Sequence, residues 1–321
     1  MFQKILVLLD GSELAEVVFP FAEELAGKLD LDVILLHVYS PALSDYVPMH
    51  RVYIDRAAST IKDQAKEARK RLGMKVKAKP IKVRGELAMG YHADEILRYA
   101  DENNVDLILM ATHGRSGIKR WTIGSVADKV LRASTVPVLL VRAGIEEEIP
   151  YDEWPSKTMI VPLDGSELAE SVLPYVEEMG KPRGAEKLDV ALIRICDPPV
   201  TPSYYSPELS GVPLNWGEYM EQETARCKQV SNEYLAEVGK RLTKKGLTIS
   251  SEVLVGKAAD EIVEYANKHP FSLIAMATQG RSGIKRLVYG SVTESVLAGV
   301  TCPMLLVRPG KTEPEEKKKE E

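Results

Sequence analysis

Apolar runs alternate with amphipathic stretches along the whole chain. The first run, residues 4–9, is apolar at every position after its lysine, which is typical of a parallel strand buried on both faces. At 13–28, apolar residues recur three and four positions apart, the pattern of a helix that packs one face against a core. Because this alternation continues along the chain, we predict an α/β fold with parallel strands and right-handed crossovers.

The pattern predicts five strands and four helices in each of two halves. In the first half we expect strands at 4–9, 33–39, 78–84, 105–110 and 137–142, and helices at 13–28, 51–72, 92–103 and 126–133. In the second half we expect strands at 158–163, 188–195, 247–255, 272–276 and 303–308, and helices at 167–179, 219–245, 258–268 and 292–298. Pro20 and Pro174 fall inside the first helix of each half and should kink it.

The two halves are copies of one domain. Asp-Gly-Ser-Glu-Leu-Ala-Glu begins at Asp10 and again at Asp164, and the second copy carries a net insertion of twelve residues in its middle. Repetition over about 150 residues indicates a duplicated domain rather than a solenoid. We therefore predict domains at 1–143 and 157–310, a linker at 144–156, and a disordered Lys- and Glu-rich tail at 311–321.

A glycine-rich segment follows the fourth predicted strand of each half. It reads ATHGRSGIKRWTIGS from Ala111 to Ser125 and ATQGRSGIKRLVYGS from Ala277 to Ser291. Glycines let backbone N–H groups approach an anion, and the N-terminus of the helix that follows adds partial positive charge. One copy alone could be a plain strand–loop–helix connection. Because both copies keep the same residues at the same spacing, we favour a phosphate-binding site.

An aspartate closes the first strand of each half, Asp10 in one and Asp164 in the other. One interpretation is capping, in which the aspartate or the serine two residues later accepts from the first helical N–H groups. The other is ligand binding, in which the carboxylate accepts from a base amine or a sugar hydroxyl. Both roles can hold, since ligands of such sheets bind outside the carboxyl ends of the strands, where the glycine segment also lies.

Cations and hydroxyls within the glycine segment extend the candidate site. Arg115 and Arg281 could screen a triphosphate, although loop arginines are often merely solvated. Ser125 and Ser291 begin the predicted last helix and could cap it, or could bind a phosphate or its Mg²⁺. No catalytic residue is predicted, because no P-loop, nucleophile-elbow or Ser–His–Asp pattern occurs and His113 is replaced by a glutamine in the second copy.

Charge, apolar runs and cysteines indicate which partners the protein binds and in which compartment it works. A net charge of −5 argues against broad nucleic-acid or membrane-surface binding, and no apolar run approaches the length of a membrane span. The apolar N-terminus reaches Asp10 too soon for a signal peptide, so we interpret it as the first strand. Cys196, Cys227 and Cys302 lack metal-ligand spacing and are expected to be buried thiols in a reducing cytoplasm.

These motifs resemble the universal stress protein family in its tandem-domain form, over about residues 1–142 and 156–308. Nucleotide-binding members carry G-x2-G-x9-G-[ST] after the fourth strand, and here both copies keep that spacing with alanine at the first position. The resemblance implies in each half a five-stranded parallel sheet of order 3-2-1-4-5 with helices on both faces. It also implies that the apolar last strands, beginning at Pro137 and Pro303, pair with each other at 137–142 and 303–308 as a pseudo-twofold dimer.

The motifs and the resemblance together give one set of cofactor-binding residues in each half. The first set comprises Asp10, Val38, Ala111, Gly114, Arg115, Gly117, Gly124, Ser125 and Val126. The second set comprises Asp164, Ile195, Ala277, Gly280, Arg281, Gly283, Gly290, Ser291 and Val292. By resemblance, Asp10 and Val38 would lie at the adenine–ribose end, and the glycines and serines at the phosphates.

The leading hypothesis is a cytoplasmic stress-response protein that binds ATP, AMP or ADP, with Mg²⁺, and changes partners or conformation when loaded. The alternatives are a scaffold that binds no nucleotide and a slow ATPase. Two chains could associate further as a homodimer. A proline- and tyrosine-rich segment at 197–217 could cover a ligand, contact the other half, or be an inert loop.

Overall fold

The structure is a computed structural model that describes residues 2–74, 80–113, 123–144, 149–182, 188–197, 216–279 and 289–309 of the 321-residue chain. The expectation of a disordered tail at 311–321 lies outside the described residues, as does all of the proline- and tyrosine-rich segment at 197–217 except Asp197, Trp216 and Gly217.

Both halves contain the strands and helices in the predicted order. The elements of the first half are β1 (Lys4–Leu8), α1 (Glu13–Glu16), α2 (Phe19–Leu29), β2 (Asp32–Tyr39), the 3₁₀ helix η1 (Pro41–Tyr46), α3 (Val47–Arg71), β3 (Val83–Met89), α4 (His92–Glu102), β4 (Leu107–Ala111), α5 (Ser125–Ala133) and β5 (Val138–Val141). After the short 3₁₀ helix η2 (Tyr151–Glu153), the elements of the second half are β6 (Lys157–Pro162), α6 (Glu167–Glu170), α7 (Leu173–Gly180), β7 (Leu188–Cys196), α8 (Trp216–Thr243), β8 (Ile249–Val255), α9 (Ala258–Lys268), β9 (Ser272–Ala277), α10 (Ser291–Gly299) and β10 (Met304–Val307).

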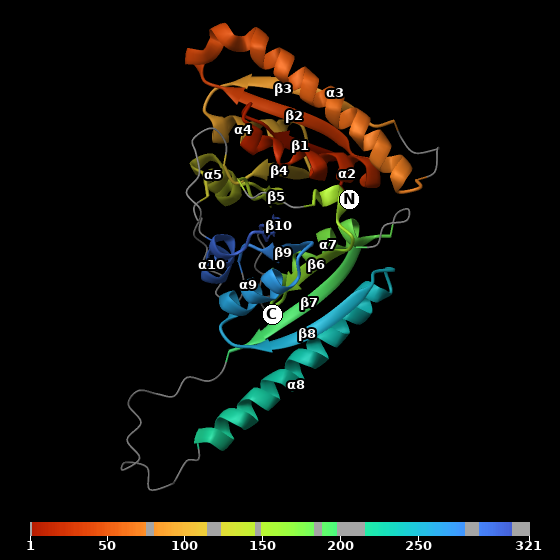
Figure 1. Cartoon of the computed structure of the whole chain (residues 1–321). Helices are drawn as coiled ribbons and strands as arrows, with labels where there is room; N and C mark the ends of the chain where they lie inside the picture. Colours follow the sequence, from red (N-terminus) through yellow and green to blue (C-terminus); the bar gives the residue numbers. More distant parts are fainter. Residues whose placement is uncertain are drawn as a thin grey trace, which may run out of the picture.

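The strands form a ten-stranded sheet that runs through both halves (Figure 1). Its order is β3-β2-β1-β4-β5-β10-β9-β6-β7-β8, so each half has the predicted order 3-2-1-4-5. Strands within a half are parallel, whereas β5 and β10 pair antiparallel, with Leu140 opposite Met304 and Val138 opposite Leu306. The last strand of each half is thus covered by its counterpart rather than left as an open edge.

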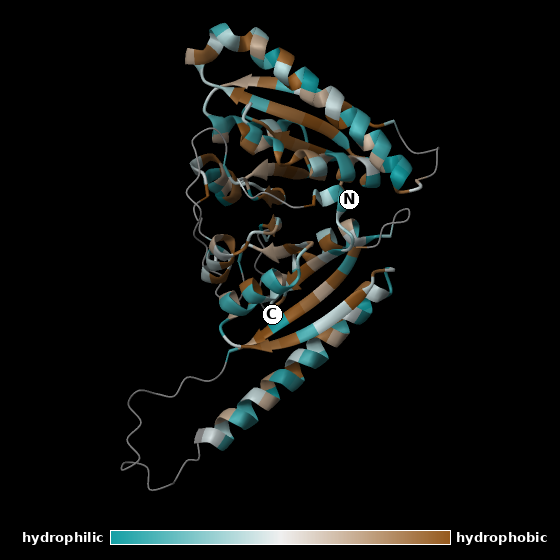
Figure 2. Ribbon diagram, viewed as in Figure 1, coloured by the Kyte–Doolittle hydropathy of each residue, from teal (hydrophilic) through white to brown (hydrophobic). Residues whose placement is uncertain are grey.

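Each face of the sheet carries its own apolar core because successive side chains of a strand point to opposite faces. Ile5 and Val7 join the core under α2, α3, α7 and α8, whereas Leu6 and Leu8 join the core under α4, α5, α9 and α10. Both cores contain residues of both halves. Figure 2 shows the consequence, with apolar strands inside and hydrophilic outer faces on α3 and α8.

The first predicted helix of each half is two helices rather than one kinked helix. Pro20 stands in the first turn of α2 and Pro174 in the first turn of α7, where a missing N–H costs nothing. The preceding α1 and α6 are four residues long and begin beside Ser12 and Ser166. The prolines therefore start a new helix after a break instead of bending a continuous one.

The third strand lies further along the chain than predicted, at Val83–Met89 instead of 78–84. The strand pairs on one side only, with β2, and its charged Arg84 and Glu86 form an ion pair of 3.1 Å at the partly exposed edge. Its Gly85 lets α3 pack closely, since a Cβ there would lie 2.9 Å from Ile54. A half-exposed edge strand with charges and a glycine gives no continuous apolar run.

Tyr151, within the predicted linker, packs against the first half. Tyr151 is buried and stacks on Phe21 of α2, with 4.1 Å between ring centroids. The ammonium group of Lys157 lies 4.3 Å from the centroid of the Tyr151 ring and pairs with Glu24, and both charged side chains are buried. Next to this pair, burial and then the nearby charge of Asp152 raise the pKa of Glu23 to about 7.

Candidate functional site

A pocket of about 380 Å³ lies at the carboxyl ends of the first-half strands. It is bounded by the ends of β1, β2 and β4 and by the start of α5, the crevice where open parallel sheets bind ligands. Six of the predicted residues line it: Asp10, Val38, Ala111, Gly124, Ser125 and Val126.

The second half has an equivalent pocket of about 290 Å³. Six predicted residues line this pocket too: Asp164, Ile195, Ala277, Gly290, Ser291 and Val292. The predicted loop residues Gly114, Arg115, Gly117, Gly280, Arg281 and Gly283 lie outside the described residues. The structure therefore brings together the strand-end and helix-start parts of both predicted sites.

The Asp-Gly-Ser turn caps the first helix and also places an aspartate in the pocket wall. The Oδ1 atom of Asp10 accepts hydrogen bonds from the backbone N–H of Ser12 at 3.0 Å and from its hydroxyl at 2.6 Å. Ser12 in turn accepts from the N–H of Ala15 at 3.3 Å and caps α1. Gly11, between them, has φ of 80°, which favours glycine. The capping role is thus present, and the carboxylate lies in the pocket wall.

A glycine precedes the helix that closes each pocket. Gly124 is the N-cap of α5 and Gly290 is the N-cap of α10, so the expectation that Ser125 and Ser291 act as N-caps is wrong. The N–H of Gly124 donates to the carbonyl of Thr112 at 2.9 Å, and a Cβ at Gly124 would lie 3.0 Å from that same oxygen. Ser125 is the first helical residue, where backbone N–H groups lack intrahelical acceptors.

Histidines distinguish the first pocket from the second. His37, His92 and His113 line the first pocket, whereas Ala258 and Gln279 stand in the second. His37 is buried, and its Nδ1–H donates to the carbonyl of Leu9 at 3.0 Å. No role was predicted from the sequence for His37 or His92, although His37 lies near the end of the second strand and His92 begins the helix after the third strand.

The rim of the first pocket is electrostatically coupled to the second half. Burial, and then the nearby Arg142 guanidinium, hold the pKa of His113 below its ordinary value. Burial likewise lowers the pKa of Arg142, whose Nη2 donates to the carbonyl of Leu297 on α10 at 2.5 Å. His113 is therefore favoured in its neutral form, as a group able to accept as well as donate a hydrogen bond.

Tyr289, next to the start of α10, contacts the helix that begins at the first pocket. Its hydroxyl donates to the carbonyl of Asp128 at 3.1 Å, and the guanidinium of Arg132 lies 4.7 Å from its ring centroid. Arg308 of the second half donates to the carbonyl of Arg132 at 3.0 Å. Helix α5 thus lines the first pocket at its start and contacts Tyr289 and Arg308 of the second half along its length.

The expectation of three free buried thiols is wrong. Cys196 and Cys227 form a disulfide, with 6.0 Å between their Cα atoms, and Cys302 is a free thiol whose pKa burial raises to about 12. The two bonded cysteines are 31 residues apart and meet because α8 packs on β7. Their spacing in the sequence does not reveal that packing.

Two kinds of feature are absent from the described ranges of the chain. Within those ranges, no group of three or more His, Cys, Asp or Glu side chains could hold a metal ion. Within the same ranges, no helix is long and apolar enough to cross a membrane.

Comparison with known proteins decides the family. A model of the universal stress protein family matches residues 1–142 and 155–308, in agreement with the duplicated site. The chain belongs to the universal stress protein family. Universal stress protein YxiE of Bacillus subtilis is 34% identical over 150 residues, covering 44% of this chain and 100% of the relative. Universal stress protein MJ0531 of Methanocaldococcus jannaschii is 31% identical over 157 residues, covering 49% of this chain and 85% of the relative.

Solved structures show that the tandem fold is shared over nearly the whole chain. A putative universal stress protein from Pseudomonas aeruginosa superposes with a TM-score of 0.62 at 17% identity and covers 96% of this chain and 94% of its own. A universal stress protein from Archaeoglobus fulgidus gives a TM-score of 0.61 at 16% identity, with 97% of each chain covered. At these identities the likeness concerns the fold alone.

Proposed function

We propose that this universal stress protein binds ATP, or AMP or ADP, in one or both pockets and acts as a nucleotide-dependent switch or partner-binding module. One observation carries the proposal. In each half an aspartate at the end of the first strand, the end of the second strand and a Gly-Ser helix start line a single pocket. The family assignment supports a role in the stress response.

The described residues fit an adenine nucleotide. The first pocket has the size range of small-molecule sites, and Val38 and Met110 give it an apolar wall suited to a base. Asp10 lies where it could accept from the base amine or the ribose hydroxyls. The start of α5 offers N–H groups without intrahelical acceptors to phosphates. We propose that Gly114, Arg115 and Gly117, with their second-half counterparts, complete the phosphate end.

Mg²⁺ would enter with the nucleotide. Protein-bound Mg²⁺ keeps several waters and is usually held through substrate phosphates and one or two side chains. Among the described residues, no acidic or histidine cluster offers a metal cage of its own. Ser125 and Ser291 are the hydroxyls at the helix starts that could contribute. We propose no catalytic residue in either pocket.

We further propose how the two halves assemble and where the protein acts. Residues 1–143 and 157–310 act as domains joined by a linker at 144–156. They pair in solution through 137–142 and 303–308, as β5 and β10 do in the sheet. Two such chains could associate as a homodimer. The protein acts in the cytoplasm without nucleic-acid or membrane partners.

A pair of first-half variants separates ligand binding from capping. Asp10→Asn keeps an oxygen acceptor for Ser12 but removes the charge, so ATP affinity of the first pocket should fall about tenfold with little loss of stability. Ser12→Ala removes the cap and should cost about 1 kcal/mol of unfolding free energy while leaving the affinity nearly unchanged. Calorimetric titration with ATP and Mg²⁺ and urea denaturation measure the two effects. Equal affinities for wild type and Asp10→Asn would refute the ligand role of Asp10.

A further inference from the structure

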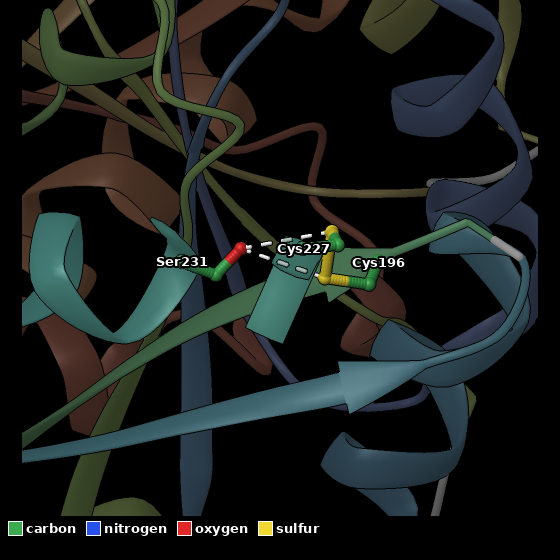
Figure 3. Close-up of a disulfide and its surroundings, with 3 residues drawn as sticks. All are labelled: Cys196, Cys227 and Ser231. Carbon is green, nitrogen blue, oxygen red and sulfur yellow. Dashed lines mark hydrogen bonds between the residues drawn. A yellow bond between two sulfur atoms is a disulfide. The ribbon is translucent and has the colours of Figure 1, made fainter. Parts of the chain in front are cut away.

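The disulfide joins the end of a strand to the long helix of the second half (Figure 3). Cys196 is the last residue of β7, and Cys227 lies on α8. Figure 1 shows α8 extending along and beyond β7 and β8. The crosslink is therefore placed to fix the carboxyl end of β7 against the helix.

Two segments that line the second pocket meet at Cys196. Ile195, the preceding residue, is part of the pocket wall. The carbonyl of Cys196 accepts a hydrogen bond from the N–H of Gly256 at 3.1 Å. Ala258, two residues after Gly256, begins α9 and lines the pocket as well. A restraint on Cys196 is thus a restraint on both of these pocket walls.

The first half has the same backbone arrangement without the crosslink. Tyr39 ends β2 and its carbonyl accepts from the N–H of Gly90 at 3.0 Å. His92, two residues later, begins α4 and lines the first pocket. Because Cys196 and Cys227 both lie in the second half, the first pocket is an internal control for the oxidation state of this pair.

The surroundings of the two sulfurs differ in a way that suits thiol–disulfide exchange. Cys196 is 2% exposed, whereas Cys227 is partly exposed. The side chain of Ser231 is fully buried, and its hydroxyl lies 3.5 Å from the Cys196 sulfur and 3.9 Å from the Cys227 sulfur. An attacking thiolate can reach Cys227, and the Ser231 hydroxyl can donate to the thiolate that leaves on Cys196.

We propose that Cys196 and Cys227 form a reversible thiol–disulfide site whose oxidation state sets the ligand affinity of the second pocket. A small dithiol supplies the electrons. Its first thiolate attacks the Cys227 sulfur, forms a mixed disulfide and expels the Cys196 thiolate, which takes up a proton. Its second thiolate then displaces Cys227, leaving two cysteine thiols and the oxidised, cyclic dithiol. A disulfide such as oxidised glutathione reverses the reaction.

The disulfide should raise the ligand affinity of the second pocket because it orders two of the pocket's walls. In the oxidised protein, the end of β7 is fixed on α8, so the walls at Ile195 and Ala258 are already in place for a ligand. After reduction these segments gain freedom, which a ligand must remove when it binds. Reduction should therefore weaken binding in the second pocket and leave the first pocket unchanged. The ligand part of this inference rests on the proposed nucleotide function.

The redox site itself is tested without any ligand. The full chain is equilibrated with oxidised glutathione or with dithiothreitol and then unfolded in urea that contains excess iodoacetamide, which alkylates free thiols. Mass spectrometry counts the alkylated cysteines. We expect one alkylated cysteine after oxidation and all three after reduction. Hydrogen exchange of the native protein should rise on reduction in β7, β8 and the start of α9, but not in β2, β3 and α4. Three alkylated cysteines in the oxidised sample, or equal exchange in both states, would overturn the site.

Binding is tested with ATP and Mg²⁺ in variants that isolate each pocket. In Asp10→Asn, which weakens the first pocket, dithiothreitol should lower the remaining affinity about tenfold. In Asp164→Asn, in which the first pocket supplies the remaining affinity, dithiothreitol should leave that affinity unchanged. Cys227→Ala should show the reduced-state affinity with or without dithiothreitol. An unchanged affinity in Asp10→Asn, or an equal loss in Asp164→Asn, overturns the control of the pocket. If ATP binds no form of the protein, the nucleotide proposal fails while the alkylation result still decides the thiol site.

The rate of disulfide reduction tests the role of Ser231. Ser231→Ala removes the hydroxyl beside the leaving sulfur and should slow reduction by dithiothreitol about tenfold, without changing the number of cysteines that react. An unchanged rate would remove Ser231 from the proposed site.

Discussion

Replacing each of the two helix-start glycines by alanine should have very different effects on stability. Gly124 and Gly290 are both N-caps with φ near −60° and ψ near 150°, a conformation open to any residue. The N–H of each donates to a strand-end carbonyl at 2.9 Å. The difference lies in space: a Cβ at Gly124 would lie 3.0 Å from the Thr112 oxygen, but a Cβ at Gly290 would lie 3.6 Å from the Thr278 oxygen.

The magnitude follows from these two distances. At 3.6 Å a methyl group makes an ordinary van der Waals contact. The Gly290→Ala change should therefore stay within about 0.5 kcal/mol, because the loss of a glycine cap opposes the lower entropy of the unfolded chain. At 3.0 Å the Thr112 carbonyl must move and its hydrogen bond to residue 124 must lengthen. Overpacking of this kind costs about 1–3 kcal/mol, so Gly124→Ala should be less stable by that amount.

Urea denaturation of the two single variants and the wild type measures the difference, with circular dichroism as the signal. The midpoint of Gly124→Ala should fall, and that of Gly290→Ala should stay near wild type. Binding should follow the same order, because Thr112 belongs to the wall of the first pocket. Equal free energies of unfolding for the two variants would refute the close approach at Gly124.

Three further predictions concern charged and polar groups. Because the pKa of His113 is lowered from its ordinary 6.5, the folded protein should lose stability as pH falls below that value, and His113→Gln should flatten this dependence in thermal melts. The pKa of Glu23 is raised to about 7, so its ionisation should destabilise the fold as pH rises from 4.5 to 7; Glu23→Gln should gain about 1–2 kcal/mol at pH 8 after allowance for solvent screening and nothing at pH 4. The matched Glu177→Gln, which loses a carboxylate 3.2 Å from the Lys245 ammonium, should show no such gain, and a similar gain would contradict the assignment. Tyr289→Phe keeps the ring over Arg132 but loses the hydroxyl contact with Asp128, and should cost about 1 kcal/mol in urea denaturation, whereas no loss would show that this contact contributes nothing.

The repeated pattern was sufficient to predict the α/β class and the order of strands and helices along the chain. Two copies of an alternating strand and helix order, each with Asp-Gly-Ser after the first strand, indicated parallel sheets whose carboxyl ends share one side. The grouping of Asp10 with Gly124 at one pocket agrees with that reasoning, whereas the strand order within the sheet was an implication of the family resemblance. The spacing of apolar and polar residues shows which faces of strands and helices are buried, so these elements could be predicted from the sequence.

Features that depend on how elements pack against each other could not be predicted in this way. The bond between Cys196 and Cys227 requires the register of α8 on β7, which no local pattern encodes. The edge strand at Val83–Met89 has mixed polarity because only one of its sides is paired. The contact of Tyr289 with α5 crosses between the halves, and the equivalent residue of the first half is Ile123, so the repeat offers no symmetric signal.

Nucleotide binding is measured by calorimetric titration of the full chain with ATP and Mg²⁺. We expect saturable binding at no more than two sites per chain, and weaker binding when Asp10 and Asp164 are both changed to asparagine. No heat at millimolar ATP, together with no nucleotide released when the purified protein is denatured, would contradict it and favour a scaffold that binds no nucleotide.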